Sequence, residues 1–328
     1  MIFGHYIREI GRGPRGARGL AQEDARQLYA AMLDGGVPDL ELGAIILALR
    51  MKGESLDEML GFLTAMDERT NRLELPPGRV RPVVLPTYSG AREEANLTPL
   101  LALLLQQFGV PVLVHGLLEG LGRMTTGLIF RELGIMPMAS IAQAQARLDE
   151  KGLVFLPLNA LCPGAYSLLN LRSRLGVRNS AHSLVKLLNP FAGDAALIVP
   201  ATHPEFIELM RAILLERGQR GLLLRATEGE PFANPRCRPR LEYIHDGMTE
   251  ALFEAEHESL RVVPDLPAAA DAATTALWIR RVLDRQITLP KPLANQLACC
   301  LVASGYAEDL CQAKAVVAVG TNGRSAAA

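Results

Sequence analysis

Residues 83–116 read VVLPTYSGAREEANLTPLLALLLQQFGVPVLVHG, and this stretch decides the fold class. A short β-rich run over Val83–Leu85 leads into a polar loop, and Thr98 then caps an apolar helix. A second β-rich run follows at Val110–Val114. Because this order of strand, loop, helix and strand is that of a βαβ unit, it predicts a mainly parallel sheet covered by helices.

The same alternation continues towards the C-terminus. Thr202 and Glu205 have the spacing of a capping box, which predicts a helix that runs to Gly218. Further strands are predicted at Val154–Leu156, Ala196–Val199 and Leu222–Leu224. Three more helices are predicted at Ala272–Leu283, Leu289–Ser304 and Glu308–Val319.

The N-terminal part is predicted to be helical throughout, because its apolar residues recur at helical spacing. Ser55 and Glu58 form a capping box at the start of one of these helices. The helices are predicted at Gln22–Leu33, at Leu40–Met51 and from Ser55 to Asp67. A Pro-rich stretch over 75–78 then marks a boundary, so we predict a helical domain over 1–75 and an α/β domain over 80–328.

Composition fits a globular protein with two domains: 328 residues, of which 49% are hydrophobic and 21% charged. The longest apolar run, Leu97–Leu105, is too short to cross a bilayer. The N-terminus has no apolar segment typical of a secretory signal, so we expect a cytoplasmic protein without membrane contact. The five cysteines form no metal-binding or disulfide pattern, which indicates free thiols.

Charge is distributed unevenly although the net charge is only −1. Residues 162–190 carry basic side chains and no acid, and residues 217–240 carry six arginines against Glu228 and Glu230. A third basic segment lies near the N-terminus, where four arginines occur within residues 8–18. We predict that basic segments of this kind gather on one face.

Three loops should meet at the carboxyl edge of the sheet, where such folds bind ligands. They are PTYSGAREEAN (86–96), HGLLEGLGR (115–123) and RATEGEP (225–231). In this order they resemble loops of the anthranilate phosphoribosyltransferases and their glycosyltransferase family 3 relatives, which use phosphoribosyl pyrophosphate (PRPP) with magnesium. The stretch FLPLNALCPGAYSLLNLRSRLGVRNSAHSLVKLLNP (155–190) resembles the same family.

The resemblance implies a fold and an assembly. The fold is α/β, with a small helical N-terminal domain and a larger mainly parallel-sheet domain, like the anthranilate phosphoribosyltransferases and nucleoside phosphorylases. Helices from about 163–190 are then expected to join the helical domain. Because the transferases pair through their helical domain, the resemblance also implies a homodimer.

A narrower resemblance concerns RNSAH (178–182), ATEGE (226–230) and ANP (233–235). These segments resemble the corresponding segments of the YbiB group. The members of this group are paralogues of the transferase and are regarded as nucleic-acid-binding proteins. The resemblance therefore implies a nucleic-acid partner rather than a small-molecule acceptor.

The donor loop departs from the transferase pattern GTGGDGxNTFNIST, in which glycines let backbone amides wrap a pyrophosphate. Here Pro86 has no N–H, Tyr88 is bulky, and Glu93 and Glu94 are acidic. The lysine and arginine of the family's KHGNR loop are replaced by apolar residues beside His115.

We predict no catalytic residue. The residues of a vestigial phosphate or substrate crevice are predicted to be Thr87, Ser89, Gly90, Asn96, Thr98, His115, Gly116 and Arg172. By the resemblance, Arg172 corresponds to the arginine that the family uses to bind the anthranilate carboxylate. The family's adjacent magnesium-binding acids are matched only loosely by Glu228 and Glu230, which are the candidate metal ligands.

Three hypotheses follow. The first is nucleic-acid binding without sequence preference and without a cofactor, in which Tyr88 and Tyr166 stack on bases. Its predicted phosphate-binding residues are Arg8, Arg12, Arg15, Arg18, Arg172, Arg174, Arg178 and Lys186. The second is a transferase that uses PRPP and magnesium, and the third is an interaction protein whose dimer is its function.

Overall fold

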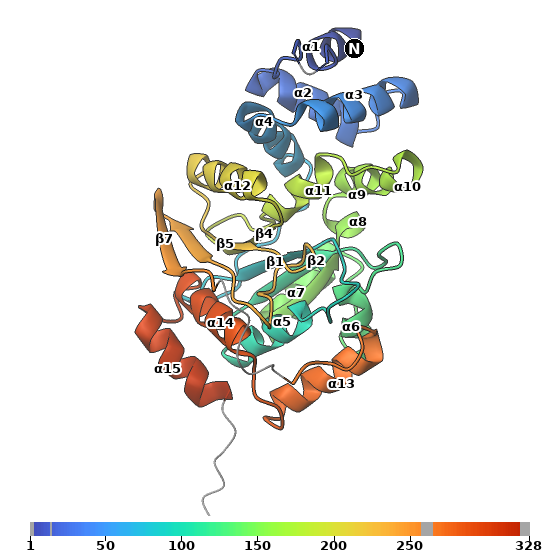
Figure 1. Ribbon diagram of the computed structural model, residues 1–328. Helices are drawn as coiled ribbons and strands as arrows, with labels where there is room; N and C mark the ends of the chain where they lie inside the picture. The colour runs from blue at the N-terminus through green and yellow to red at the C-terminus, as the bar shows by residue number, and fades with distance from the viewer. Residues whose placement is uncertain (1–2, 14, 257–264, 322–328) are drawn as a thin grey trace, which may run out of the picture. The chain divides into compact units, whose positions relative to one another are not determined.

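The computed structural model describes residues 3–13, 15–256 and 265–321 and contains two compact units (Figure 1). Residues 1–72 and 158–190 make up the helical unit, and residues 73–157 and 191–328 make up the α/β unit. The predicted fold class is confirmed: an N-terminal helical domain is followed by an α/β domain with a mostly parallel sheet.

The helical unit is built on a pair of packed helices, α2 and α4. Gly61 allows their close approach, since a Cβ there would lie 2.2 Å from the Gln22 carbonyl oxygen. Tyr29 and Phe62 stack in its core with their ring centroids 4.6 Å apart. Its elements are α1 (Gly4–Ile10), α2 (Gln22–Leu33), α3 (Asp39–Lys52), α4 (Leu56–Asp67), α8 (Leu158–Leu161), α9 (Pro163–Asn170), α10 (Arg172–Leu175), α11 (Ala181–Leu184) and the 3-10 turn η1 (Val185–Leu187).

The predicted capping box at the start of α4 is confirmed. The Ser55 hydroxyl accepts from the Glu58 amide at 3.3 Å, and Glu58 accepts from the Ser55 amide at 2.8 Å. The same buried carboxylate also accepts from the Leu20 amide at 3.0 Å and from Lys52 Nζ at 2.6 Å. One carboxylate thus joins the start of α4 to the end of α3 and to the chain that leads into α2.

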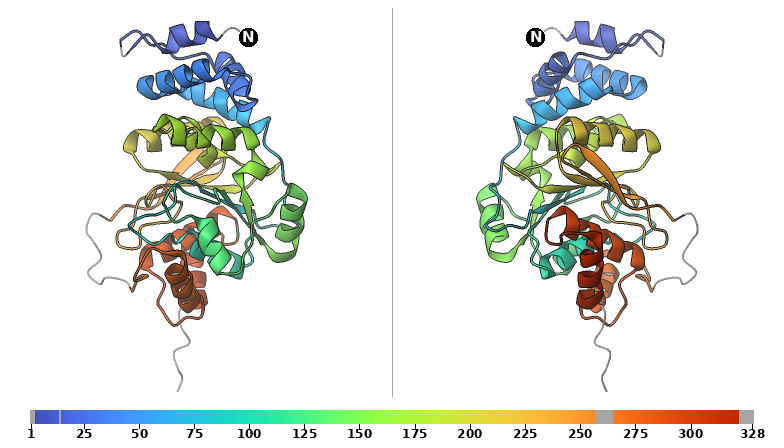
Figure 2. Two further views of the ribbon diagram at one scale, coloured as in Figure 1. Left: turned by 90° about the vertical axis from the view of Figure 1, so that its right-hand side faces the viewer. Right: turned by 90° about the vertical axis from the view of Figure 1, so that its left-hand side faces the viewer.

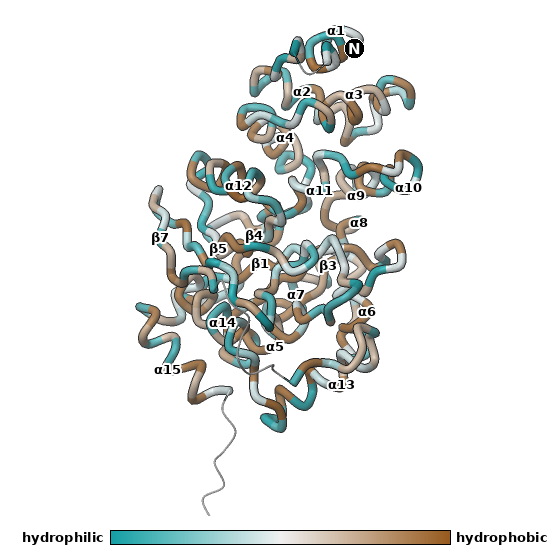
Figure 3. Tube along the Cα trace, in the orientation of Figure 1, coloured by the Kyte–Doolittle hydropathy of each residue, from teal (hydrophilic) through white to brown (hydrophobic). Residues whose placement is uncertain are grey.

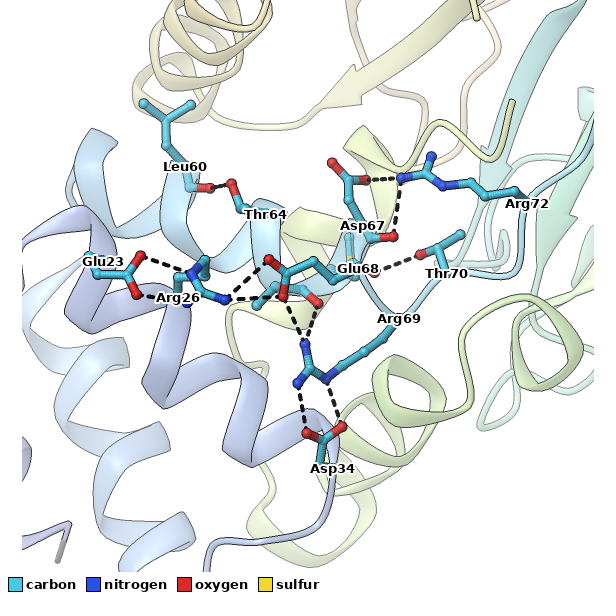
Figure 4. Close-up of polar contacts among 12 residues, drawn as sticks. Glu23, Arg26, Asp34, Leu60, Thr64, Asp67, Glu68, Arg69, Thr70 and Arg72 are labelled. Atoms are coloured by element: carbon cyan, nitrogen blue, oxygen red, sulfur yellow. Dashed lines mark hydrogen bonds and ion pairs between the residues drawn. The ribbon is translucent and has the colours of Figure 1, made fainter. Parts of the chain in front are cut away.

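Ion pairs link the ends of α2 and α4 on the surface of the helical unit (Figure 4). Arg26 contacts Glu23 at 2.7 Å and Glu68 at 3.1 Å. Arg69 contacts Glu68 at 3.2 Å and Asp34 at 2.6 Å. Because these side chains are partly exposed and screened by solvent, each pair adds little to stability.

The α/β unit holds a seven-stranded sheet in the order β3-β2-β1-β4-β5-β6-β7. Its first five strands in this order are parallel, and β6 and β7 continue the sheet antiparallel. The strands are β1 (Val83–Thr87), β2 (Val112–Gly116), β3 (Leu153–Pro157), β4 (Ala196–Ala201), β5 (Gly221–Arg225), β6 (Leu241–His245) and β7 (Met248–Phe253).

Helices cover both faces of this sheet. Helix α12 lies on one face, and α5 and α14 lie on the other, with α15 packed outside α14 (Figures 1 and 2). The interior is mainly apolar, as the brown colour of the tube shows (Figure 3). The helices are α5 (Thr98–Gln107), α6 (Thr126–Glu132), α7 (Ile141–Lys151), α12 (Pro204–Glu216), α13 (Ala272–Leu283), α14 (Lys291–Ala303) and α15 (Leu310–Thr321).

Two predicted helix caps are wrong. Thr98 belongs to α5 without capping it, and its amide donates to Asn96 Oδ1 at 3.1 Å. The N-cap of α12 is His203, whose side chain makes no capping hydrogen bond, so the predicted box of Thr202 and Glu205 does not form. In the described part of the chain, no helix is long and apolar enough to cross a membrane.

Candidate functional site

The predicted crevice loops of the α/β unit do come together at the carboxyl ends of β1 and β2. Thr87 and Gly116 end these neighbouring strands and are paired in the parallel register. The strands approach closely there, since a Cβ on Gly116 would lie 2.0 Å from the Thr87 carbonyl oxygen. This contact explains why a glycine follows His115.

The Glu230 carboxylate lies at the centre of these loops and is fully buried. Its Oε1 accepts from the amides of Ser89 at 2.8 Å and Gly90 at 2.9 Å. Gly90 has φ +64°, and a Cβ there would lie 2.9 Å from the Arg123 Cβ. The loop amides that a phosphate would need are therefore hydrogen-bonded to the protein's own carboxylate.

The other oxygen of Glu230 collects side-chain donors. Its Oε2 accepts from the Thr87 hydroxyl, from Asn96 Nδ2 at 3.2 Å and from the Thr98 hydroxyl at 3.4 Å. The Thr126 hydroxyl, which sequence reasoning missed, lies at 3.4 Å from the same oxygen. The predicted crevice residues Thr87, Ser89, Gly90, Asn96 and Thr98 thus gather as predicted, but around an internal anion.

A second carboxylate, that of Glu228, occupies a neighbouring part of the loop. It accepts from the amides of Arg92 at 2.9 Å, Glu93 at 2.9 Å and Glu94 at 2.8 Å. Arg123 approaches the same carboxylate at 3.5 Å and donates to the Gly90 carbonyl at 2.9 Å. Sequence reasoning missed Arg123 also, although its loop was among those predicted to line the crevice.

His115 and Tyr88 form a buried pair beside this cluster. The Tyr88 hydroxyl and His115 Nδ1 are hydrogen-bonded, and the two rings meet edge to face with centroids 5.4 Å apart. Tyr88 is only 8% exposed, so the prediction that it stacks on bases is wrong. Tyr166, the other predicted stacking residue, is 38% exposed.

These residues do not fit PRPP with magnesium. Five amides of the donor loop already donate to Glu228 and Glu230, and Tyr88 is packed where the family pattern has glycine. The Glu228 and Glu230 carboxylates are surrounded by N–H and O–H donors. Such donors stabilise an anion and do not suit a hard cation. Within the described residues, no group of three or more His, Cys, Asp or Glu side chains is arranged to hold a metal ion.

Three of the four predicted basic residues of segment 172–186 lie near His182 in the helical unit. Burial, together with the positive charges of Arg178, Arg172 and Lys186, lowers the pKa of His182 to about 3. Arg172 makes no ion pair with any described residue. Lys186 is only 8% exposed, so its ammonium group is poorly placed to contact a phosphate at the surface.

Arg174 and the N-terminal arginines lie on the surface of the same unit. Arg174 contacts Asp39 at 3.2 Å, and both side chains are largely exposed, so the pair is weak. Arg12 contacts Glu9 at 2.8 Å. Four predicted phosphate-binding residues near the N-terminus are at least partly exposed, namely Arg8, Arg12, Arg15 and Arg18.

The third basic segment, 217–240, belongs to the α/β unit and is largely neutralised. Arg220 contacts Asp194 and Asp246, and Arg236 contacts Glu94. The remaining pairs are Arg238 with Glu256 and Arg240 with Glu242 and Glu254. At least four of its six arginines thus have acidic partners, which leaves little free positive charge there for a phosphate backbone.

The chain is similar to one family model and to several known proteins. A model of the glycosyl transferase family, helical bundle domain, matches residues 5–70. A protein from Escherichia coli strain K12 named "Uncharacterized protein YbiB" is 47% identical over 311 residues, which cover 94% of this chain and 97% of that protein. Anthranilate phosphoribosyltransferase of Methanopyrus kandleri is 25% identical over 284 residues, 85% of this chain and 84% of the relative.

Solved structures with the same fold include anthranilate phosphoribosyltransferase (TrpD) from Thermus thermophilus. It has a TM-score of 0.77 at 22% identity and is matched over 96% of this chain and 94% of its own. The Saccharomyces cerevisiae enzyme in complex with PRPP and Mg has a TM-score of 0.73 at 14% identity, over 97% and 94% of the two chains. At these identities the likeness concerns the fold.

Proposed function

We propose that this chain, which belongs to the family of YbiB, binds nucleic acid without sequence preference on its helical unit. The observation that carries this proposal is the concentration of positive charge around Arg172. The segment 162–190 contains no acid, and Arg172 has no ion pair within the described residues. A phosphate backbone supplies the negative charges that this segment lacks.

Two further features support the same ligand. Exposed Tyr166 on α9 precedes Arg172 and Arg174 on α10, and α9 packs against α10, so an aromatic ring and cations occur together. This combination is typical of proteins that bind single strands by stacking and by charge. The arginines at 8–18 add positive charge to the same unit.

The alternative, transfer of a phosphoribosyl group from PRPP, has less support. Such a reaction needs donors aimed at the leaving pyrophosphate. In this protein the corresponding amides point at Glu228 and Glu230. We therefore expect the protein to act without PRPP or magnesium.

We also propose that the protein is a homodimer that pairs through α3. Leu40, Leu47 and Met51 are exposed, at 84%, 45% and 81%, and recur on one face of this helix. Acids lie in its first turn and bases in its last turn. An antiparallel pair of α3 helices would cover the apolar face and bring the acidic end of each helix to the basic end of the other.

Alanine variants test nucleic-acid binding on the helical unit. Replacing Arg172, Arg174 and Arg178 together should weaken binding of a labelled oligonucleotide at least about tenfold, and by the same factor for unrelated sequences. Arg281→Ala, which removes an exposed arginine of α13, is the matched control and should change affinity little. Unchanged affinity of the triple variant, with a folded far-UV spectrum, would remove this segment from the binding surface.

A further inference from the structure

We propose that Glu228 is a tethered anion that fills a phosphate-binding cradle, and that the cradle accepts a pyrophosphate group once this carboxylate is removed. The cradle consists of the backbone amides of Arg92, Glu93 and Glu94 together with the Arg123 guanidinium. This inference does not depend on nucleic-acid binding, because all of its residues lie in the α/β unit.

The donors of the cradle converge on one point. Three successive amides donate to the Glu228 carboxylate at 2.8–2.9 Å, and Arg123 Nη2 lies 3.5 Å from its Oε2. These amides belong to a loop rather than to the start of a helix. Successive N–H groups that point to one side of a loop form a concave anion site, which suits phosphate oxygens as well as a carboxylate.

The backbone at residue 228 is unusual for glutamate. Its φ is +52°, in the left-handed region that favours glycine, and Gly229 follows at φ +94°. A glutamate in this conformation needs compensation from its surroundings, and the hydrogen bonds to the three amides provide it. Glu228 therefore keeps this strained conformation while its carboxylate fills the cradle.

The two carboxylates of this loop differ in access to solvent. Glu230 is fully buried among its donors, whereas the side chain of Glu228 is 18% exposed and that of Arg123 is 23% exposed. A ligand can thus reach the Glu228 cradle without unfolding the Glu230 cluster. The tethered carboxylate competes with any such ligand at high effective concentration, which lowers the apparent affinity of the intact protein.

Calorimetry with inorganic pyrophosphate tests the inference on the full chain. Glu228→Gly removes the tethered anion and suits the positive φ, so it should fold and bind pyrophosphate at least about tenfold more tightly than the wild type. Adding Arg123→Ala should abolish most of this gain. Glu119→Gly is the control, because it removes an exposed acid of a neighbouring loop, and it should leave the affinity at the wild-type value.

A folded Glu228→Gly variant that binds pyrophosphate no better than the wild type would overturn the inference. An equal gain in Glu119→Gly would also overturn it, because general loss of negative charge would then explain the effect. If Glu228→Gly fails to fold, Glu228→Gln takes its place. Its neutral side chain holds the amides less strongly, so it should also bind pyrophosphate more tightly than the wild type, and no increase would count against the cradle.

Discussion

The single residue Glu230 holds the donor loop in place without a ligand. Its two oxygens satisfy the amides of Ser89 and Gly90 and the buried side chains around them. Glu230→Ala leaves these donors unsatisfied and should destabilise the α/β unit by about 3 kcal/mol or more, measured by urea denaturation. Glu119→Ala should change stability by less than about 0.5 kcal/mol. Equal stability of the two variants would contradict the central position of Glu230.

His182 should make stability depend on pH. Its folded-state pKa, lowered to about 3, lies below the unfolded value near 6.5, so the unfolded chain binds a proton first. Stability is then lost as the pH falls from about 6.5 towards 3, by about 1–2 kcal/mol at pH 5 relative to pH 7. His182→Gln should reduce this loss in denaturation curves. A wild-type-like loss in the variant would show that other groups cause it.

Sequence reasoning reached the individual site residues only in part. Thr87, Asn96 and Thr98 could be predicted as crevice residues because their types suit hydrogen bonding. The residue that accepts their hydrogen bonds could not be predicted, because Glu230 lies 134 residues from Asn96 and only the folded sheet brings these two residues together. Arg123 was missed because the family motif KHGNR has its basic residues within three positions of the histidine, whereas Arg123 lies eight residues after His115.

Variants of Ser55 and Glu58 test the capping box at the start of α4. Ser55→Ala removes one hydrogen bond at the helix start and should cost about 1 kcal/mol. Glu58→Ala should cost more, about 2–3 kcal/mol, because this buried carboxylate also accepts from the Leu20 amide and from Lys52. Thermal unfolding measures both. The reverse order would contradict the role given to Glu58.

The elements that sequence reasoning missed had weak or overlooked signals. Strands β6 and β7 are joined at Asp246-Gly247, both with positive φ, and Asp-Gly is the sequence signal of this hairpin. The predicted cap of α5 was wrong because the Asn96 side chain accepts a hydrogen bond from the Thr98 amide. The spacing of residues in the sequence does not distinguish this arrangement from capping by Thr98 itself. By contrast, α2 and α13 have the predicted bounds because their apolar periodicity ends at clear stop signals.

The proposed dimer depends on the exposed face of α3. Leu47→Asp places a charge in the middle of that face and should convert a dimer into a monomer in light scattering coupled to size-exclusion chromatography. Leu277→Asp is the control, because Leu277 is an exposed apolar residue of α13 at 59% exposure, and it should leave the mass unchanged. A wild type that is monomeric at micromolar concentration would refute the pairing.

The overall fold was largely predictable because the βαβ order and the family resemblance agree. That helices from about 163–190 join the N-terminal helices was expected only from the resemblance, since no local pattern reports which distant helices pack together. In the structure the helical unit includes residues 158–190. The neutralised segment 217–240 could not be foreseen either. Its arginines pair with acids such as Glu94 and Asp194, which are remote in sequence.

Binding of labelled oligonucleotides at several salt concentrations, with PRPP and magnesium titrated in parallel by calorimetry, tests nucleic-acid binding most directly. If about six phosphates are neutralised, the logarithm of the affinity should fall against the logarithm of the salt concentration with a slope of about −4 to −5. The slope should be the same for unrelated sequences. A flat salt response together with tight, magnesium-dependent PRPP binding would contradict the account.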